Sequence, residues 1–484
     1  MIESNMMKLE TANYSRLSES QLKTLHHATL EILERTGIRI LDEEAVKTFK
    51  KGDCEIVDGN RVHIPAWRVE WALGITPKQI ILYDQTGEPA IRLGAKRTFF
   101  GPGSDLLKIL DHRTDEHREA MMQDVREYIL IHDALPNFDF VMSGFIPKDV
   151  PVEKVETLQM QAMLEYTNKP IVYVTTGTHN TELDVEMAEI VAGGADELRR
   201  KPFAACYINI THPLKHNQDS LQKLIYLSKK RLPFVYRPSI VTRGLTGPVT
   251  QAGFLVCNNA STLAGLVLAH LTREGAPFIR CCCPGGTFDM KTMVGTHTGA
   301  EIRGFNEELA QYYDMPSFGL GGSTASKVVD QQAAIEATLN LLTGVLAGGG
   351  LLHDVGYMGS STLGSFTQTA ICHEIISWIK HYIKGLEINE EQLALDVINE
   401  VGSKSLDDPT YGKFIDTEHT YKHFKEDHYP ELLDQRHYDS WLAAGSKTMK
   451  DRANEKVEKI LAEHQPPLMD EEIRKSLKEI VDKA

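Results

Sequence analysis

The chain has 484 residues and a formal net charge of −15 at pH 7; 42% of its residues are hydrophobic and 25% are charged. Nucleic acids and anionic membranes select for basic surfaces, so this charge disfavours both as partners. No uncharged apolar run of about 18 residues, the length that spans a membrane, stands out, and we therefore expect a globular protein.

Two further features concern the cellular compartment. The first residues, MIESNMMKLETANYS, lack the basic start and apolar segment of a signal peptide, which predicts a cytoplasmic protein. The seven cysteines are an odd number spread through a large chain, so reduced thiols are expected rather than a disulfide framework.

The first predicted element is a helix at residues 18–37, SESQLKTLHHATLEILERTG, with Gly37 as its C-terminal cap. We assign residues 1–96 to a helical and extended segment that packs on the main domain. Charged segments at helical spacing near the other end, such as EEIRKSLKEIVDKA, predict a C-terminal helical extension over residues 386–484.

Between these two regions, short apolar segments rich in β-branched and aromatic residues alternate with helix-like sequence. There are eight of them, at residues 97–105, 138–145, 169–178, 202–211, 232–240, 276–286, 315–323 and 350–360. Eight βα units whose strands are apolar on both faces predict a (β/α)8 TIM barrel over residues 97–385. A doubly wound open sheet is the alternative.

The C-terminal ends of barrel strands form the rim on which such enzymes keep their active sites. Aromatic and neutral polar residues prevail there, and paired carboxylates of the glycosidase kind are scarce. Ring faces attract a cation, and an Arg or His binds a carboxylate, so this rim suits a small zwitterion with a quaternary ammonium group. The candidate substrate-binding residues are Phe99, Tyr173, Tyr207, Asn209, Tyr236, Arg237, His353, Tyr357 and Phe366.

Each of these residues also has a simpler interpretation. Any single aromatic side chain is more often part of a core than of a binding site, and only their convergence suggests a site. Arg237 stands within an apolar strand, where an unpaired guanidinium would be costly, so it must have a partner. A structural salt bridge explains it as well as a substrate does.

A glycine-rich turn follows the seventh predicted strand in PSFGLGGSTASKVVDQQAAIE, residues 316–336. It does not match a dinucleotide fingerprint, because Thr324 stands where the last glycine is needed. It does not match a P-loop either, because Lys327 follows Ser326 instead of preceding a Ser or Thr. Its place on the rim still predicts a functional loop.

The run Cys281-Cys282-Cys283 raises the alternative of a zinc-dependent thiol methyltransferase. Adjacent strand residues point to opposite faces, so at most Cys281 and Cys283 share one. No C-x-x-C or H-x-E-x-H pattern supplies further ligands, and we predict no intrinsic metal.

Long stretches of the chain, including LHHATLEILERTGIRILDEEAV, FGPGSD and FGLGGSTASKVVDQQAAIEATLNLLTGVLAGGGLLHDVGYM, carry a family resemblance. The sequence resembles the trimethylamine methyltransferase (MttB) superfamily, corrinoid-dependent enzymes built on a (β/α)8 barrel. Trimethylamine enzymes of that family carry a pyrrolysine in the strand-seven region, around Gly322 and Ser323 here, and this sequence has none. The resemblance implies that Gly321, Gly322 and Ser323 form a corrinoid-facing loop.

The missing pyrrolysine has a chemical meaning within this resemblance. A tertiary amine is a poor leaving group, whereas a quaternary ammonium already leaves as a neutral amine. The resemblance therefore implies methyl transfer from a quaternary amine, foremost glycine betaine giving dimethylglycine, to the Co(I) corrinoid of a cognate partner protein. Proline betaine and carnitine are alternative substrates, and no residue is assigned as acid or base. A compatible-solute binding protein is the non-enzymatic alternative, and a homo-oligomer is expected.

Overall fold

The computed structural model describes residues 14–94, 96–210, 214–238, 242–281, 286–295 and 300–484. Its central sheet has seven strands, and every neighbouring pair is parallel. In spatial order the strands are β6 (Phe99–Phe100), β17 (Leu351–His353), β16 (Ser317–Leu320), β13 (Phe278–Cys281), β12 (Phe234–Pro238), β10 (Ala204–Ile210) and β9 (Ile171–Val174). Seven of the eight predicted strand segments therefore lie side by side.

The one remaining predicted segment, residues 138–145, closes the sheet between β6 and β9. Asp139 donates its backbone N–H to the Phe100 carbonyl over 2.7 Å, and Val141 donates to the Pro170 carbonyl over 2.9 Å. It forms an isolated bridge instead of a regular strand, because the Asp139 carboxylate takes the Phe100 N–H that a ladder would use. The barrel prediction is confirmed, and the open-sheet alternative is wrong.

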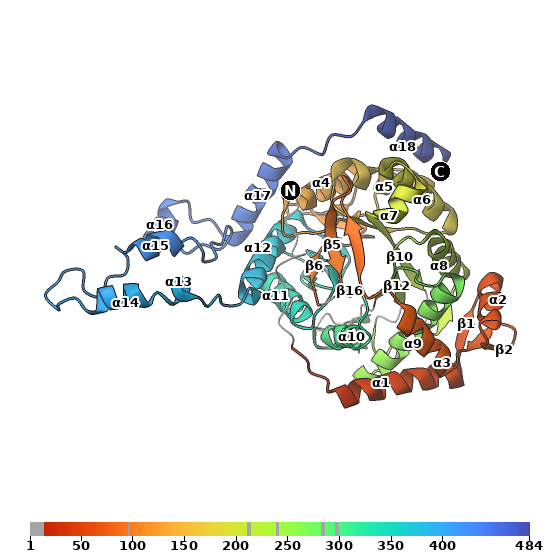
Figure 1. Ribbon diagram of the computed structural model, residues 1–484. Helices are drawn as coiled ribbons and strands as arrows, with labels where there is room; N and C mark the ends of the chain where they lie inside the picture. Colours follow the sequence, from red (N-terminus) through yellow and green to blue (C-terminus); the bar gives the residue numbers. More distant parts are fainter. Residues whose placement is uncertain (1–13, 95, 211–213, 239–241, 282–285, 296–299) are drawn as a thin grey trace.

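Helices surround the barrel, as Figure 1 shows. They are α4 (Met122–Ala134), α5 (Val155–Tyr166), α6 (Thr178–Ala192), α7 (Ala195–Arg200), α8 (Gln218–Lys230), α9 (Gln251–Thr272), α10 (Ala300–Tyr312), α11 (Gln331–Leu346) and α12 (Phe366–Ile383). Contrary to the expectation from sequence, α9 is long and apolar enough to cross a membrane; 89% of its most apolar window is buried. This burial against the barrel accounts for its composition.

The N-terminal region contains more β structure than predicted. Its elements are α1 (Glu19–Glu31), η1 (Ile32–Thr36), β1 (Ile38–Ile40), α2 (Glu43–Lys51), β2 (Glu55–Val57), β3 (Arg61–His63), α3 (Ala66–Ile75), β4 (Ile80–Tyr83) and β5 (Pro89–Leu93). The first predicted helix is confirmed: Ser18 caps its start, and the chain leaves it at Gly37 with a φ of 68°.

The antiparallel β4–β5 hairpin fills the N-terminal end of the barrel. Ile80, Leu82, Ile91 and Leu93 pack in one buried cluster with the inward-facing side chains of the barrel strands. These inward residues include Phe99, Phe140, Val172, Ala205, Tyr207, Val235, Ile279, Phe318 and Leu351. The interior is therefore a packed core, and only its C-terminal end is available for a site.

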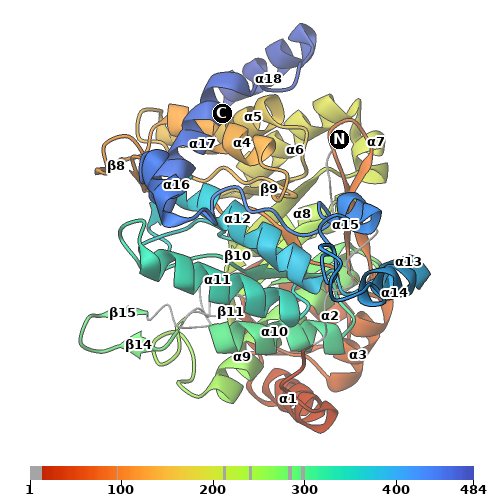
Figure 2. The same cartoon turned by 90° about the vertical axis from the view of Figure 1, so that its left-hand side faces the viewer.

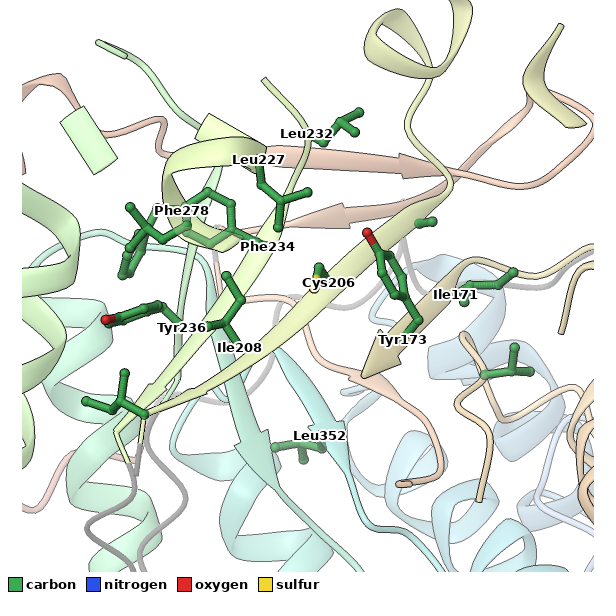
Figure 3. Packing of buried hydrophobic residues seen from close by; sticks show 14 of the residues in the cluster. Ile171, Tyr173, Cys206, Ile208, Leu227, Leu232, Phe234, Tyr236, Phe278 and Leu352 are labelled. Carbon is green, nitrogen blue, oxygen red and sulfur yellow. The ribbon is translucent and has the colours of Figure 1, made fainter. Parts of the chain in front are cut away.

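Side chains on the opposite face of the strands pack beneath the helices (Figure 3). Tyr173, Cys206, Ile208 and Tyr236 belong to this outer cluster. Since successive strand residues alternate in direction, their neighbours Asn209 and Arg237 point inward.

Short sheets and the C-terminal extension complete the chain. The remaining elements are β7 (Lys108–Leu110), β8 (His117–Glu119), η2 (Val152–Lys154), β11 (Lys215–His216), β14 (Phe288–Asp289), β15 (Val294–Gly295), β18 (Leu363–Gly364), α13 (Glu390–Leu393), α14 (Leu395–Gly402), α15 (Glu418–His423), α16 (Tyr438–Ala443), α17 (Met449–Glu463) and α18 (Glu471–Lys483). Helices α17 and α18 return to the barrel, where α17 packs on α12 and α4, and α18 on α5 and α6. The three-part division at residues 96 and 385 stays a prediction.

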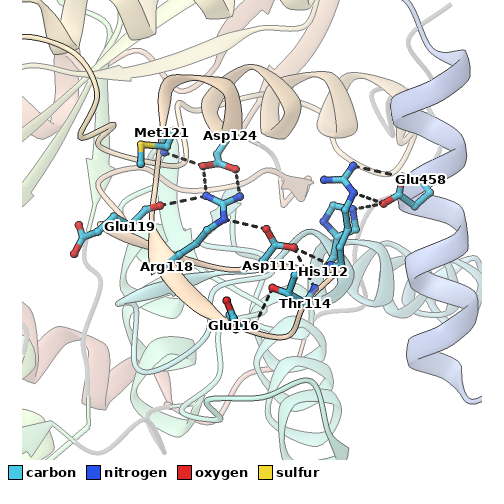
Figure 4. A network of polar contacts seen from close by, with 10 residues as sticks. Asp111, His112, Thr114, Glu116, Arg118, Glu119, Met121, Asp124 and Glu458 are labelled. Atoms are coloured by element: carbon cyan, nitrogen blue, oxygen red, sulfur yellow. Dashed lines mark hydrogen bonds and ion pairs between the residues drawn. The ribbon is translucent and has the colours of Figure 1, made fainter.

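A polar network joins the β7–β8 hairpin to α4 and to α17 (Figure 4). The Arg118 guanidinium donates to both carboxylate oxygens of Asp124 over 2.7 Å and to Asp111 over 2.9 Å. These carboxylates raise the pKa of Arg118. His112 contacts Glu458 of α17 over 2.8 Å. The extension is thus joined to the barrel by charge-assisted bonds as well as by apolar packing.

Candidate active site

The inward-facing side chains at the C-terminal ends of neighbouring strands form the candidate site. Tyr207 and Asn209 are two residues apart on β10, and Arg237 lies near the end of β12. Asn209 pairs with Arg237 in the parallel register, and Leu320 pairs with His353 between β16 and β17. Because parallel strands end at one edge, these residues surround the same opening.

Aromatic rings line the floor of this opening. The Phe318 ring centroid lies 4.3 Å from that of His353 and 5.3 Å from that of Tyr207, and the Tyr207 and His353 centroids are 5.8 Å apart. Phe318 is fully buried, whereas Tyr207 and His353 keep 6% and 5% exposure. Phe318 therefore supports the two rings that can touch a ligand.

The orientation of His353 is fixed by the backbone. Its Nδ1 lies 2.6 Å from the Gly319 carbonyl oxygen, an acceptor, so Nδ1 carries a hydrogen. Its Nε2 faces the Asp354 carboxylate at 3.4 Å. These two contacts hold the ring in a fixed orientation at this edge of the opening.

Arg237 supplies a cationic group to the site. Its Nη1 donates to the Asn209 Oδ1 over 3.1 Å, and the side chain is half-buried. A guanidinium is a planar, permanently charged fork of N–H donors, and this geometry matches the two oxygens of a carboxylate. This pair is well suited to bind a substrate carboxylate.

Carboxylates stand close to the same opening. The side chain of Asp105 is reached by solvent, but the protein that encloses it limits its hydration and raises its pKa to about 6. The charges of Asp354 and Glu156 also raise this pKa, whereas Arg237 and a Ser104 hydrogen bond lower it. Glu156 is held by the loop after β9, where it accepts hydrogen bonds from Thr176 over 2.8 and 2.6 Å. The rim therefore carries negative charge beside the aromatic floor.

Asp105 and Asp354 share an unusual backbone conformation. Their φ angles are 70° and 63°, in the left-handed region that side chains rarely adopt. A Cβ on Gly103 would meet the Asp354 Oδ1 at 2.1 Å, so the two loops are in close contact. Strained non-glycine residues of this kind cluster at functional sites.

The structure brings together four of the nine predicted substrate-binding residues: Tyr207, Asn209, Arg237 and His353. Phe99 also faces inward, but it lies fully buried among the residues of the barrel core. Tyr357 joins two rim loops, because its hydroxyl donates a hydrogen bond to the Ser104 carbonyl over 2.6 Å.

The other three residues lie outside the barrel interior. Tyr173 packs in the outer cluster (Figure 3). Tyr236 points toward α9, where its hydroxyl contacts the His216 Nδ1 over 2.8 Å and its ring lies against Gly265. Phe366 begins α12 and packs on Tyr128 and Phe145. None of these three joins the candidate site.

The loop after strand β16 is tightly packed. Gly321, Gly322 and Ser323 are buried, and Gly321 donates its N–H to the His353 carbonyl over 2.8 Å. Gly322 has a φ of 71°, and a Cβ there would meet Val355 at 3.1 Å. The small residues allow two rim loops to pack together; the corrinoid-facing role of this loop stays a prediction.

The structure also places the thiols considered for zinc. Cys281 belongs to the inner cluster and Cys206 to the outer one, so the sheet separates them. Cys282 and Cys283 lie outside the described residues. Among the residues that are described, no group of three His, Cys, Asp or Glu side chains is arranged to hold a metal.

Comparisons with known proteins agree with this architecture. A family model for trimethylamine methyltransferase (MTTB) matches residues 2–484. Trimethylamine methyltransferase MttB of Desulfitobacterium hafniense (strain DSM 10664 / DCB-2) is 31% identical and covers 100% of this chain and 96% of the relative. Glycine betaine methyltransferase of Desulfitobacterium hafniense (strain Y51) is 30% identical, with 97% and 96% covered.

A solved structure supports the fold independently. The monomethylamine methyltransferase MtmB of Methanosarcina barkeri superposes with a TM-score of 0.51, over 94% of this chain and 90% of that chain. Its identity of 11% restricts this likeness to the fold. Since the family match and the relatives extend over essentially the whole sequence, this protein is a methyltransferase that belongs to the trimethylamine methyltransferase (MttB) family.

Proposed function

We propose that this enzyme transfers a methyl group from a quaternary amine, foremost glycine betaine, to the corrinoid of a cognate partner protein. The main support is the pairing of opposite charges at one opening. Arg237 with Asn209 offers a place for a carboxylate. Tyr207, His353 and the nearby carboxylates of Asp105 and Asp354 offer a place for a cation. A small zwitterion matches both.

The reaction requires little acid–base chemistry from the protein. The bond between nitrogen and one methyl carbon breaks, and the electron pair stays on nitrogen. The leaving group is dimethylglycine with a neutral amine and a carboxylate that is still ionised, so it carries one negative charge. The corrinoid supplies the metal nucleophile that accepts the methyl group. The residues of the site orient the substrate and exclude water, and no proton has to move.

The rim offers a surface on which a partner's macrocycle can rest. Leu245 and Val249 in the loop after β12, and Met290 and Met293 in the β14–β15 region, are exposed large apolar side chains. Flat, largely apolar groups bind to surfaces of this kind. A docked corrinoid would contact these two loops.

Arg237 favours a substrate that carries a carboxylate. Glycine betaine, proline betaine and carnitine share this group with a quaternary nitrogen, whereas trimethylamine has neither. Both kinds of substrate appear in the names of the relatives, one a trimethylamine and one a glycine betaine methyltransferase. Because Arg237 lies at the opening, we propose a betaine as the substrate instead of trimethylamine.

A direct assay tests the proposal. The purified enzyme is incubated with a reduced corrinoid protein and, separately, with glycine betaine, proline betaine, carnitine and trimethylamine. We expect the absorbance change of corrinoid methylation with glycine betaine, and an equal amount of dimethylglycine by mass spectrometry. No absorbance change with any quaternary amine would remove the proposed activity.

The pH dependence of substrate binding should report on Asp105. Its pKa of about 6 means that the carboxylate is charged above this pH and neutral below it. We expect KM for glycine betaine to rise as the pH falls from 7 to 5. Asp105→Asn keeps the shape and tolerates the left-handed backbone, so it should remove this rise. Its KM at pH 8 should be about fivefold above wild type, the value of one partly solvated ionic contact.

The result is decided by the shape of the pH profile. Glu153→Gln, an exposed carboxyl outside the site, is the matched control and should keep the wild-type profile. If Asp105→Asn shows the same rise in KM below pH 6 as wild type, Asp105 does not face the substrate.

A further inference from the structure

An extended arm, residues 386–446, leaves the barrel after α12 and returns to it at α17 (Figure 1). It contains the short helices α13 to α16 and only two buried large apolar residues, Val401 and Leu432. Nearly half of the exposed large apolar side chains among the described residues lie on it. A segment with this composition has no core of its own and needs a surface to cover it.

The internal contacts of the arm are polar. Its outgoing and returning legs are joined where Lys422 and His423 both pair with Glu391, the latter at 3.4 Å. Gln392 also donates to Glu426 over 3.4 Å. Meanwhile Ile388 and Ile398 on the outgoing leg are 71% and 51% exposed. The two legs are thus held together by exposed polar contacts instead of a core, and their apolar side chains lie uncovered beside them.

The barrel carries a second apolar surface next to the root of the arm; it is largely exposed, although the His428 ring of the same chain's arm meets Trp378 edge-on, with centroids 5.9 Å apart. Ile335 and Leu339 lie one turn apart on α11 and are 67% and 53% exposed. Trp378 and Tyr382 are likewise one turn apart on the neighbouring α12, and both are exposed. We call the outward faces of α11 and α12, with these four residues, the α11–α12 face.

We propose that the arm covers the α11–α12 face of a second copy of this chain, and that the second copy returns the contact. Such a reciprocal exchange closes a two-fold dimer and covers both apolar surfaces of both chains. Arm-on-arm pairing is disfavoured, because residues 386–446 contain 14 acidic residues against 5 lysines and arginines. The exposed end of α12, by contrast, carries Lys384.

The position of the arm argues against the corrinoid protein as its occupant. Barrel helices run opposite to the strands, so the C-terminal end of α12 lies at the end of the barrel away from the site. Figure 2 shows α13 and α14 on the side opposite the β14–β15 hairpin of the rim. A partner that delivers a reacting group must sit at the rim. This inference does not depend on the proposed substrate.

Sedimentation velocity and light scattering test the exchange. Wild type should have a mass of two chains or a multiple of this, against 54.2 kDa for one. Leu395→Glu with Ile398→Glu on the arm should give the 54.2 kDa species, and Ile335→Lys with Leu339→Lys on α11 should do the same. Val152→Glu, at a highly exposed position before α5, is the control and should keep the wild-type mass.

Mixing the two double variants distinguishes the proposed exchange from nonspecific association of apolar surfaces. A chain with an intact arm and one with an intact α11–α12 face can still form one of the two contacts, so the mixture should regain a two-chain species that neither variant forms alone. Circular dichroism checks that each variant is folded, and Leu395→Gln with Ile398→Gln is the milder replacement if the glutamates prevent folding. A single-chain wild type at micromolar concentration overturns the proposal. An arm variant that keeps the wild-type mass also overturns the proposal. This holds even if that variant loses methyl transfer to the corrinoid protein.

Discussion

Replacing Arg237 by methionine is expected to raise KM for glycine betaine about 100-fold, since losing a charge-assisted contact to a substrate carboxylate costs roughly 2–5 kcal/mol. The variant leaves Asn209 without its guanidinium partner but keeps the length of the side chain. Initial rates of corrinoid methylation against betaine concentration give KM and kcat. The increase should fall mainly on KM, because the carboxylate contact is present in the ground state and the transition state alike.

Two comparisons make this result specific to carboxylate recognition. Arg237→Lys keeps the charge but loses the planar fork. Its KM for glycine betaine should therefore lie between those of wild type and Arg237→Met. Binding of choline, which has the same cation without a carboxylate, should be little changed in both variants by calorimetry. If methionine leaves KM for glycine betaine unaltered, Arg237 has a structural role only.

Replacing Phe318 by alanine should produce the largest loss of stability, about 3–5 kcal/mol, as for other buried phenylalanines. The ring is fully buried among Phe140, Tyr207 and His353. Its removal leaves a cavity under the two rings that face the opening. The midpoint of urea unfolding, followed by circular dichroism, should therefore shift to lower urea, and KM for betaine should rise because Tyr207 and His353 lose their support.

Phe318→Leu retains most of the buried apolar volume and should cost clearly less than alanine. Phe305→Ala, at a partly buried phenylalanine of α10, is a second control and should have a smaller effect on unfolding and none on KM. An alanine variant at position 318 with wild-type unfolding would contradict the described packing of the barrel interior.

The eight segments of the barrel wall could be predicted because each is a short apolar run followed by a helix, a pattern set by burial on both faces. That same property hides the direction of individual side chains. Tyr236 and Arg237 are adjacent in β12, so they cannot both point inward. The register pairs Arg237 with the inward-facing Asn209, so Arg237 is the one that points inward. Tyr207 and Asn209, two residues apart, share a face, and both reach the site.

The carboxylates at the opening were less accessible to prediction. Asp105 and Asp354 follow strands β6 and β17 in the loops FGPGSD and LLHDVG, and Glu156 comes from α5, a helix outside the barrel. Their proximity depends on how the rim loops fold, which no local pattern encodes. The exposure of the arm's apolar side chains was not predicted, for a related reason. Its apolar residues look like core positions until the structure shows that nothing covers them.

A crystal structure of the complex with glycine betaine tests the central claim most directly. We predict the carboxylate within hydrogen-bonding distance of Arg237 and the quaternary nitrogen between Tyr207, His353 and the Asp105 and Asp354 carboxylates, with one methyl group directed out of the barrel. Betaine bound away from this opening, or bound there with its carboxylate far from Arg237, would contradict the account.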